Sequence, residues 1–149
     1  VIIIGSLVID KKIGISTSSD KIFKFITDPS KIPLVLPGLI ENKNIPTLPL
    51  KVGSKFKYKY QMYGAILEGW WVVTEINSPE TYMAKTDGDA ISEWSYKLTK
   101  KKNGTLVHLR IKYGVPKSVL SKIKVNVIKS INEKEIDHYF HNLKTVFEM

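Results

Sequence analysis

The 149-residue sequence contains no cysteine. Its absence excludes a disulfide framework, a thiol nucleophile and a thiolate metal site. The sequence also lacks a long apolar run. The opening stretch VIIIGSLVID reaches only nine residues before Asp10, well short of the about 20 that a membrane-spanning helix needs. We interpret this stretch as a strand, and expect a cytoplasmic protein without a transmembrane segment.

Arginine is nearly absent, since Arg110 is the only one in the sequence. The net charge of +9 therefore comes almost wholly from lysine. Bidentate recognition of phosphates and bases favours the arginine fork over the lysine point charge, so we predict no specific nucleic-acid partner. Lysines at alternate positions, such as Lys55, Lys57 and Lys59, indicate a solvated strand face. A weak contact of this basic face with an anionic membrane or nucleic acid stays open as a third function.

The length and the 43% hydrophobic content predict one domain over residues 1–149, with a real core and no linker. A strand is expected over 5–15, and Ser18 or Ser19 should cap the helix that follows. Asp28-Pro29 ends that helix, because the residue before proline disfavours the helical conformation. One further helical turn over 30–35 must stop before Pro37-Gly38, so the sequence predicts two short helices.

From Leu39 the hydrophobic period changes to two, and turn residues divide the chain into short segments. This pattern predicts a sequential antiparallel sheet, with strands over 39–46, 55–63, 65–76, 81–86, 91–100 and 105–115. After Pro116 the chain contains neither glycine nor proline, which predicts one long helix to the C-terminus. Its apolar stripe would consist of Leu120, Ile123, Val127, Ile131, Ile136, Phe140, Leu143 and Phe147.

This order of elements resembles the START-like or SRPBCC superfamily, which includes polyketide cyclase/dehydrase relatives, birch-pollen-allergen-like (Bet v 1-like) proteins and lipid-transfer domains. The resemblance rests on the order and spacing of KIFKFITDPSKIPLVLPGL, LKVGSKFKYKY, VVTEINSPETY, WSYKLTKKKNGTLVHLRIKY and HNLKTVFE. It implies an α+β helix-grip fold, in which a curved antiparallel sheet of about seven strands wraps a long C-terminal helix. The two short helices after the first strand would close one end.

Alternation along the predicted strands assigns the side chains to the two faces of the sheet. His108 and Arg110 then lie on the outer face. In AILEGWWVVTE the assignment conflicts, because an inward Trp71 exposes Trp70 unless a bulge at Gly69 redirects it. An exposed Trp70 would favour a subunit contact in a homodimer, and the oligomeric state stays open.

The predicted interior combines many polar-tipped aromatic residues with almost no charge. The hydroxyl and indole groups of such residues need hydrogen-bond partners. A cavity that holds a semi-polar ligand supplies these partners, whereas in a solid core the groups find them only by reaching its rim. We prefer the cavity, lined by Tyr58, Tyr60, Met62, Trp71, Trp94, Tyr96, Tyr113 and Phe140. Phe25, Ile32 and Leu36 in the proline-broken segment would form a mobile gate or a fixed plug.

Catalytic motifs are scarce. His138 and His141 are three residues apart on the predicted helix, a spacing that suits a metal, but no third ligand is indicated. The sequence has no glycine-rich phosphate loop and no nucleophile elbow. We therefore predict no cofactor, no metal site and no named catalytic residue.

The sequence favours binding or transport of a hydrophobic or amphipathic small molecule, such as a lipid, an isoprenoid or an aromatic polyketide-like compound. The alternative is an enzyme of the polyketide cyclase/dehydrase kind, in which the pocket shape and tyrosine hydroxyls would fold the substrate. The carrier is preferred because no acid/base set is evident.

Overall fold

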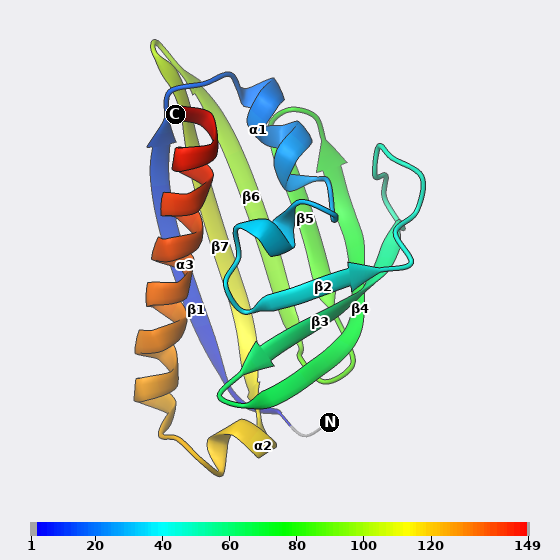
Figure 1. Cartoon of the computed structure of the whole chain (residues 1–149), viewed down its shortest axis with the longest axis vertical. Helices are drawn as coiled ribbons and strands as arrows, with labels where there is room; N and C mark the ends of the chain where they lie inside the picture. Colours follow the sequence, from blue (N-terminus) through cyan, green and yellow to red (C-terminus); the bar gives the residue numbers. More distant parts are fainter. Residues whose placement is uncertain (1–2, 149) are drawn as a thin grey trace.

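The computed structural model describes residues 3–148, which form one seven-stranded antiparallel sheet and a long helix on its concave side (Figure 1). The strand order is β1-β7-β6-β5-β4-β3-β2. The strands are β1 (Ile3–Ile15), β2 (Leu39–Lys43), β3 (Lys55–Met62), β4 (Ala65–Asn77), β5 (Thr81–Thr86), β6 (Ser92–Lys101) and β7 (Gly104–Pro116). The predicted α+β helix-grip fold is confirmed, and β2 is shorter than expected.

Two short helical segments connect β1 to β2. Helix α1 (Ser19–Ile26) is capped by Ser18, whose side chain accepts a hydrogen bond from the Lys21 amide at 3.3 Å. The second segment, η1 (Ile32–Leu34), is a single 3₁₀ turn. In Figure 1, α1 lies beside the C-terminal end of the long helix, and Phe25 packs edge-on against Phe147 there, with ring centroids 5.6 Å apart.

The C-terminal helix is interrupted, which corrects the prediction of one continuous helix. The structure has a four-residue helix α2 (Lys117–Leu120) and then α3 (Val125–Glu148). In the intervening turn the amides of Lys122 and Ile123 both bond to the carbonyl of Val119, whose side chain is fully buried. Helix α3 has 24 residues, so it spans about 36 Å and runs alongside β1.

The buried face of α3 also differs from the predicted apolar stripe. Val127 and Ile131 are 42% and 43% exposed, respectively. The buried positions are Ile128, Asn132, Ile136, Tyr139, Phe140 and Leu143. Asn132 and Tyr139 carry polar atoms, so hydrophobic patterning alone does not identify them as buried positions.

The paired strands fix which tryptophan points inward. Strands β3 and β4 pair in unbroken register from Lys55↔Val72 to Met62↔Ala65, so the bulge considered at Gly69 does not occur. Trp71 faces the interior. Trp70 faces outward, with the Lys55 and Lys57 ammonium groups 4.8 and 5.2 Å from its ring centroid, and these contacts leave it half-buried.

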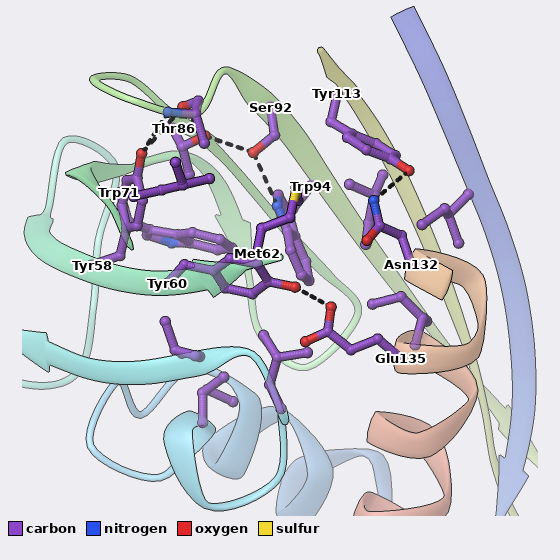
Figure 2. A pocket seen from close by; sticks show the side chains of 18 of the residues that line it. Tyr58, Tyr60, Met62, Trp71, Thr86, Ser92, Trp94, Tyr113, Asn132 and Glu135 are labelled. Carbon is purple, nitrogen blue, oxygen red and sulfur yellow. Dashed lines mark hydrogen bonds between the residues drawn. The ribbon is translucent and has the colours of Figure 1, made fainter. Parts of the chain in front are cut away.

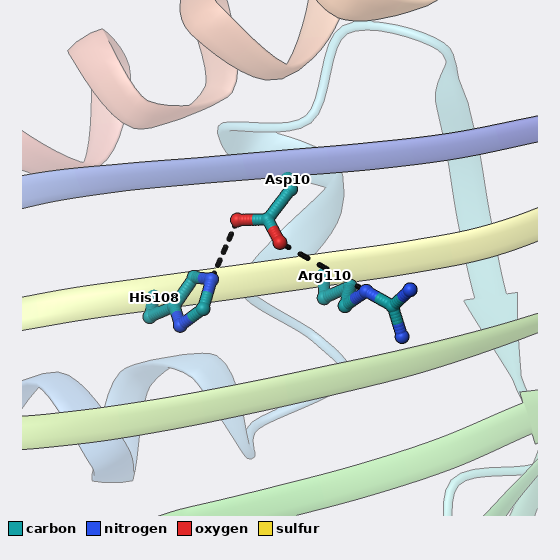
Figure 3. A network of polar contacts seen from close by, with 3 residues as sticks. All are labelled: Asp10, His108 and Arg110. Carbon is teal, nitrogen blue, oxygen red and sulfur yellow. Dashed lines mark hydrogen bonds and ion pairs between the residues drawn. The ribbon is translucent and has the colours of Figure 1, made fainter.

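The outer face also carries a small ionic network on β1 and β7 (Figure 3). Asp10 lies 2.6 Å from His108 Nε2 and 3.8 Å from Arg110 Nε. His108 and Arg110 therefore lie on the face that the alternation predicts. These groups are partly or fully exposed, so the network is a surface feature that adds little to stability.

A pair of tyrosine hydroxyls joins the sheet to the helix inside the core. Tyr96 on β6 and Tyr139 on α3 are almost fully buried, and their hydroxyl oxygens are 2.7 Å apart. The Tyr82 ring stacks on that of Tyr96 at 5.7 Å. Burial raises the pKa of both paired phenols, so they stay protonated and one donates to the other.

Removing one hydroxyl of this pair should lower the free energy of unfolding by more than removing both. We expect Tyr139→Phe to lower the free energy of unfolding by about 1–3 kcal/mol, because the Tyr96 hydroxyl loses its buried partner. The double Tyr96→Phe/Tyr139→Phe variant should recover most of that loss. Urea unfolding measures both, with Tyr63→Phe as a control, since the Tyr63 hydroxyl makes only a 3.4 Å contact to the Ile128 carbonyl. Additive losses in the double variant would contradict this account.

Candidate functional site

A cavity of about 130 Å³ lies between the concave sheet face, α3 and the η1 segment. Most of its wall is apolar or aromatic. The inner faces of β3, β4 and β6 supply Phe56, Tyr58, Tyr60, Met62, Leu67, Trp71, Trp94 and Tyr96, and α3 supplies Asn132, Glu135 and Ile136. Figure 2 shows the aromatic side chains converging on this space from the strands, with α3 opposite.

Most residues that the sequence placed at the cavity line it in the structure. They are Tyr58, Tyr60, Met62, Trp71, Trp94, Tyr96 and Tyr113. Phe140 does not, because it packs in the core beside Tyr139, with ring centroids 5.8 Å apart. Of the three gate candidates, Ile32 and Leu36 line the cavity. Phe25 turns away from it toward Phe147, so it anchors α1 to the end of α3.

The charged residue at the cavity that the sequence did not reveal is Glu135, which lines it from α3. Its Oε2 accepts a hydrogen bond from the Gly38 amide at 2.6 Å. Its Oε1 accepts one from the Tyr60 hydroxyl (Figure 2). The carboxyl thus ties together α3, strand β3 and the loop after η1. A Cβ at position 38 would lie 2.5 Å from Glu135 Oε2 and 2.6 Å from Tyr60 Cζ, so a larger residue there would displace both side chains.

Two opposing effects act on the Glu135 carboxyl. Burial raises its pKa above the usual range, whereas the hydrogen bonds from Tyr60 and Gly38 favour the ionised form and lower it. The balance is a raised pKa. Burial, with a contribution from the Glu135 charge, also raises the pKa of Tyr60, Tyr63 and Tyr113. These phenols therefore stay protonated near neutral pH and do not act as bases.

Other polar groups at the cavity wall mostly bond to one another. Asn132 Nδ2 donates to the Tyr113 hydroxyl at 2.9 Å. Trp94 Nε1 donates to Ser92 Oγ at 3.1 Å, and Trp71 Nε1 donates to the Tyr82 hydroxyl at 2.9 Å. One acceptor remains open: Asn42 Nδ2 donates to the Pro29 carbonyl at 2.8 Å, but its buried Oδ1 has no partner within the described chain.

The loop 87–91 between β5 and β6 completes the cavity wall. It bonds to the part of β4 that has no partner in β5. The Tyr58 hydroxyl donates to the Asp87 carbonyl at 2.7 Å and accepts from the Ala90 amide at 3.1 Å. Burial raises the pKa of Tyr58 to about 12. A Cβ at Gly69 would collide with the Asp87 carbonyl. The glycine in β4 is thus explained by this close approach.

The structure gives no support for a metal site at the histidine pair. His138 and His141 are both exposed on α3. Among residues 3–148, no group of three or more His, Asp or Glu side chains is placed to hold a metal ion. None of the helices in that range is both long enough and apolar enough to cross a membrane.

Comparison with known proteins gives likenesses of fold. No family model and no curated protein matches the sequence. A START superfamily protein from Mycobacterium smegmatis superimposes with a TM-score of 0.75 at 12% identity, over 97% of this chain and 98% of that one. Ginseng major latex-like protein 151 from Panax ginseng gives a TM-score of 0.59 at 19% identity, over 89% and 97%.

A third solved structure is the di-domain ARO/CYC protein StfQ from the steffimycin biosynthetic pathway. It gives a TM-score of 0.74 at 10% identity, over 96% of this chain and 51% of StfQ, so the match spans about half of that protein. The chain therefore has the START-like helix-grip fold that the sequence predicted. At these identities the likeness shows the fold alone.

The raised pKa of Glu135 predicts a specific pH dependence of stability. The folded state binds the proton of the Glu135 carboxyl more tightly than the unfolded chain does, because the pKa is higher in the folded state. Glu135 therefore stabilises the folded state increasingly as the pH falls from 7 toward 4.5, the ordinary pKa of the group. Wild type should therefore gain stability relative to Glu135→Gln over that range, because glutamine does not titrate. Thermal unfolding of both proteins across this pH range measures the difference, and parallel curves would contradict the assignment.

Proposed function

We propose that the protein binds and carries a small, largely apolar molecule in the cavity between the sheet and α3. The observation that carries this proposal is the wall itself, which is aromatic and apolar with a few polar groups directed inward. Ligand sites have this composition, because apolar burial supplies affinity and a few fixed polar groups supply orientation.

The volume limits the size of the ligand. At about 130 Å³, the cavity is smaller than the roughly 300–1,000 Å³ of pockets for drug-sized ligands. It is close to the roughly 150 Å³ of an engineered cavity that binds benzene. A cavity of this size suits a ligand of about one ring. A lipid or isoprenoid would require outward movement of the segment that carries Ile32 and Leu36, which corresponds to the mobile gate rather than the fixed plug, the two alternatives that the sequence leaves open.

The carrier is favoured over an enzyme by the state of the phenols. Burial raises the pKa of Tyr58, Tyr60 and Tyr96, so none of them serves as a base near neutral pH. The Tyr58 and Tyr96 hydroxyls are also engaged with other protein groups. An enzyme would need groups free to exchange protons with a substrate.

Glu135 supports the second candidate function, a polyketide cyclase/dehydrase-type enzyme. A carboxyl whose pKa is raised by burial inside a cavity suits general acid/base work near neutral pH. The carrier proposal predicts that a bound polyketide-like compound is recovered chemically unchanged after incubation, as liquid chromatography with mass detection would show. Conversion that disappears in Glu135→Gln, with affinity kept within severalfold, would establish the enzyme instead.

A larger side chain that fills the cavity should strongly weaken the binding of a small apolar ligand. Trp71 and Trp94 line it, so their fluorescence reports its occupancy. We expect toluene and benzyl alcohol to change the fluorescence of the wild type saturably, and Ile136→Phe to weaken both at least tenfold, because the larger ring occupies the space. Val127→Phe is the matched control, since that side chain lies on the exposed face of the same helix.

Circular dichroism establishes that both variants are folded, because overpacking a core position costs typically about 1–3 kcal/mol. A wild type that shows no saturable response to either probe would refute the carrier proposal. Equal weakening in Val127→Phe would show that the probes bind elsewhere.

A further inference from the structure

The cavity contains a carboxyl group without a counter-ion. Among residues 3–148 no lysine, arginine or histidine lies within 4.0 Å of the Glu135 carboxyl, and every ion pair found there joins other groups. A carboxylate has room for about four hydrogen bonds, and the protein supplies two, from Gly38 and Tyr60. Glu135 therefore has acceptor sites left, and a half-buried charge without a cation is costly.

A second unsatisfied group, which belongs to a residue of the cavity wall, is also an acceptor. Asn42 Oδ1 is buried and has no partner within the described chain, while Nδ2 of the same amide is fixed on the Pro29 carbonyl. The donors of Asn132, Trp71 and Trp94 are already used within the protein. A ligand that complements these open groups must donate hydrogen bonds rather than accept them.

The phenols of three tyrosines lie near the Glu135 carboxyl. Tyr60 bonds to Glu135, and the Glu135 charge acts electrostatically on the phenols of Tyr63 and Tyr113 as well. Figure 2 shows the Tyr60 and Glu135 side chains directed at each other across the cavity. The faces of aromatic rings attract cations, most strongly where water is excluded.

From the unpaired carboxyl, the open acceptors and the tyrosine rings, we infer that the cavity selects a small apolar amine in its ammonium form. The charged nitrogen binds Glu135, and the apolar body lies among the aromatic side chains of the sheet. This inference rests on the proposed carrier function and names the chemical class of its ligand. A neutral alcohol of the same shape fills the same space but leaves the carboxylate unpaired.

Benzylamine and benzyl alcohol test this inference, because they have the same shape and differ in charge. Tryptophan fluorescence at pH 7 gives both affinities for wild type, Glu135→Gln and Glu133→Gln. Glu133 is the matched control, since it lies two residues away on α3 and pairs with Lys11 at 3.7 Å. We expect wild type and Glu133→Gln to bind benzylamine at least tenfold more tightly than benzyl alcohol. In Glu135→Gln the two affinities should agree within threefold.

The outcomes separate this inference from the carrier function. Equal affinities in the wild type, or an amine preference that persists in Glu135→Gln, would overturn the inference while the bound alcohol still supports a carrier. Failure of both probes to bind wild type would overturn the carrier function. The wild-type comparison alone is decisive if Glu135→Gln does not fold, and retained affinity for benzyl alcohol shows that the cavity of the variant is intact.

Discussion

The packing of α3 into the concave face of the sheet is the contact on which the cavity depends. Ile128 near one end of the helix and Leu143 near the other are fully buried. Between them, Asn132, Glu135 and Ile136 face the cavity instead. Apolar burial therefore holds the helix near both ends, whereas between them polar side chains reach the sheet, Asn132 bonding to Tyr113 and Glu135 to Tyr60. This arrangement keeps open a space that apolar burial would otherwise close.

Polar groups inside this space differ in whether the protein satisfies them. The Tyr96–Tyr139 and Asn132–Tyr113 pairs are complete without a ligand, so they fix how the helix sits on the sheet. Glu135 and Asn42 are incomplete, and a protein selected for stability alone would replace them with apolar residues. Local departures from the rules of stable packing are expected where a protein binds something. The incomplete groups thus mark the part of the wall directed at a ligand.

The strands and their faces could be predicted because each has a strong local signal. Lysines alternate with aromatics along β3, and Asn103-Gly104 fixes the register of β6 against β7. The sequence does not decide which of Trp70 and Trp71 points inward, because either of two adjacent large apolar residues can occupy the buried face. Only the pairing of β4 with β3 decides it.

The break in the C-terminal helix and the site residue Glu135 were less predictable, because they depend on contacts between residues that are distant in sequence. The break at 121–124 contains neither glycine nor proline, and it follows the burial of Val119 rather than a local breaker. Glu135 lies seven residues after Ile128, on the same side of the helix, but its charge suggests the solvated face. Its inward direction depends on Tyr60 and Gly38, which are distant in sequence.

The central claim is that the cavity holds a ligand, and native mass spectrometry of the protein purified from its own host cells tests it most directly. The account predicts a stoichiometric small-molecule adduct that Ile136→Phe loses and Val127→Phe keeps, and extraction would then identify it. A clean unliganded mass for the wild type, with no thermal stabilisation by a panel of amines, lipids and polyketides, would contradict it.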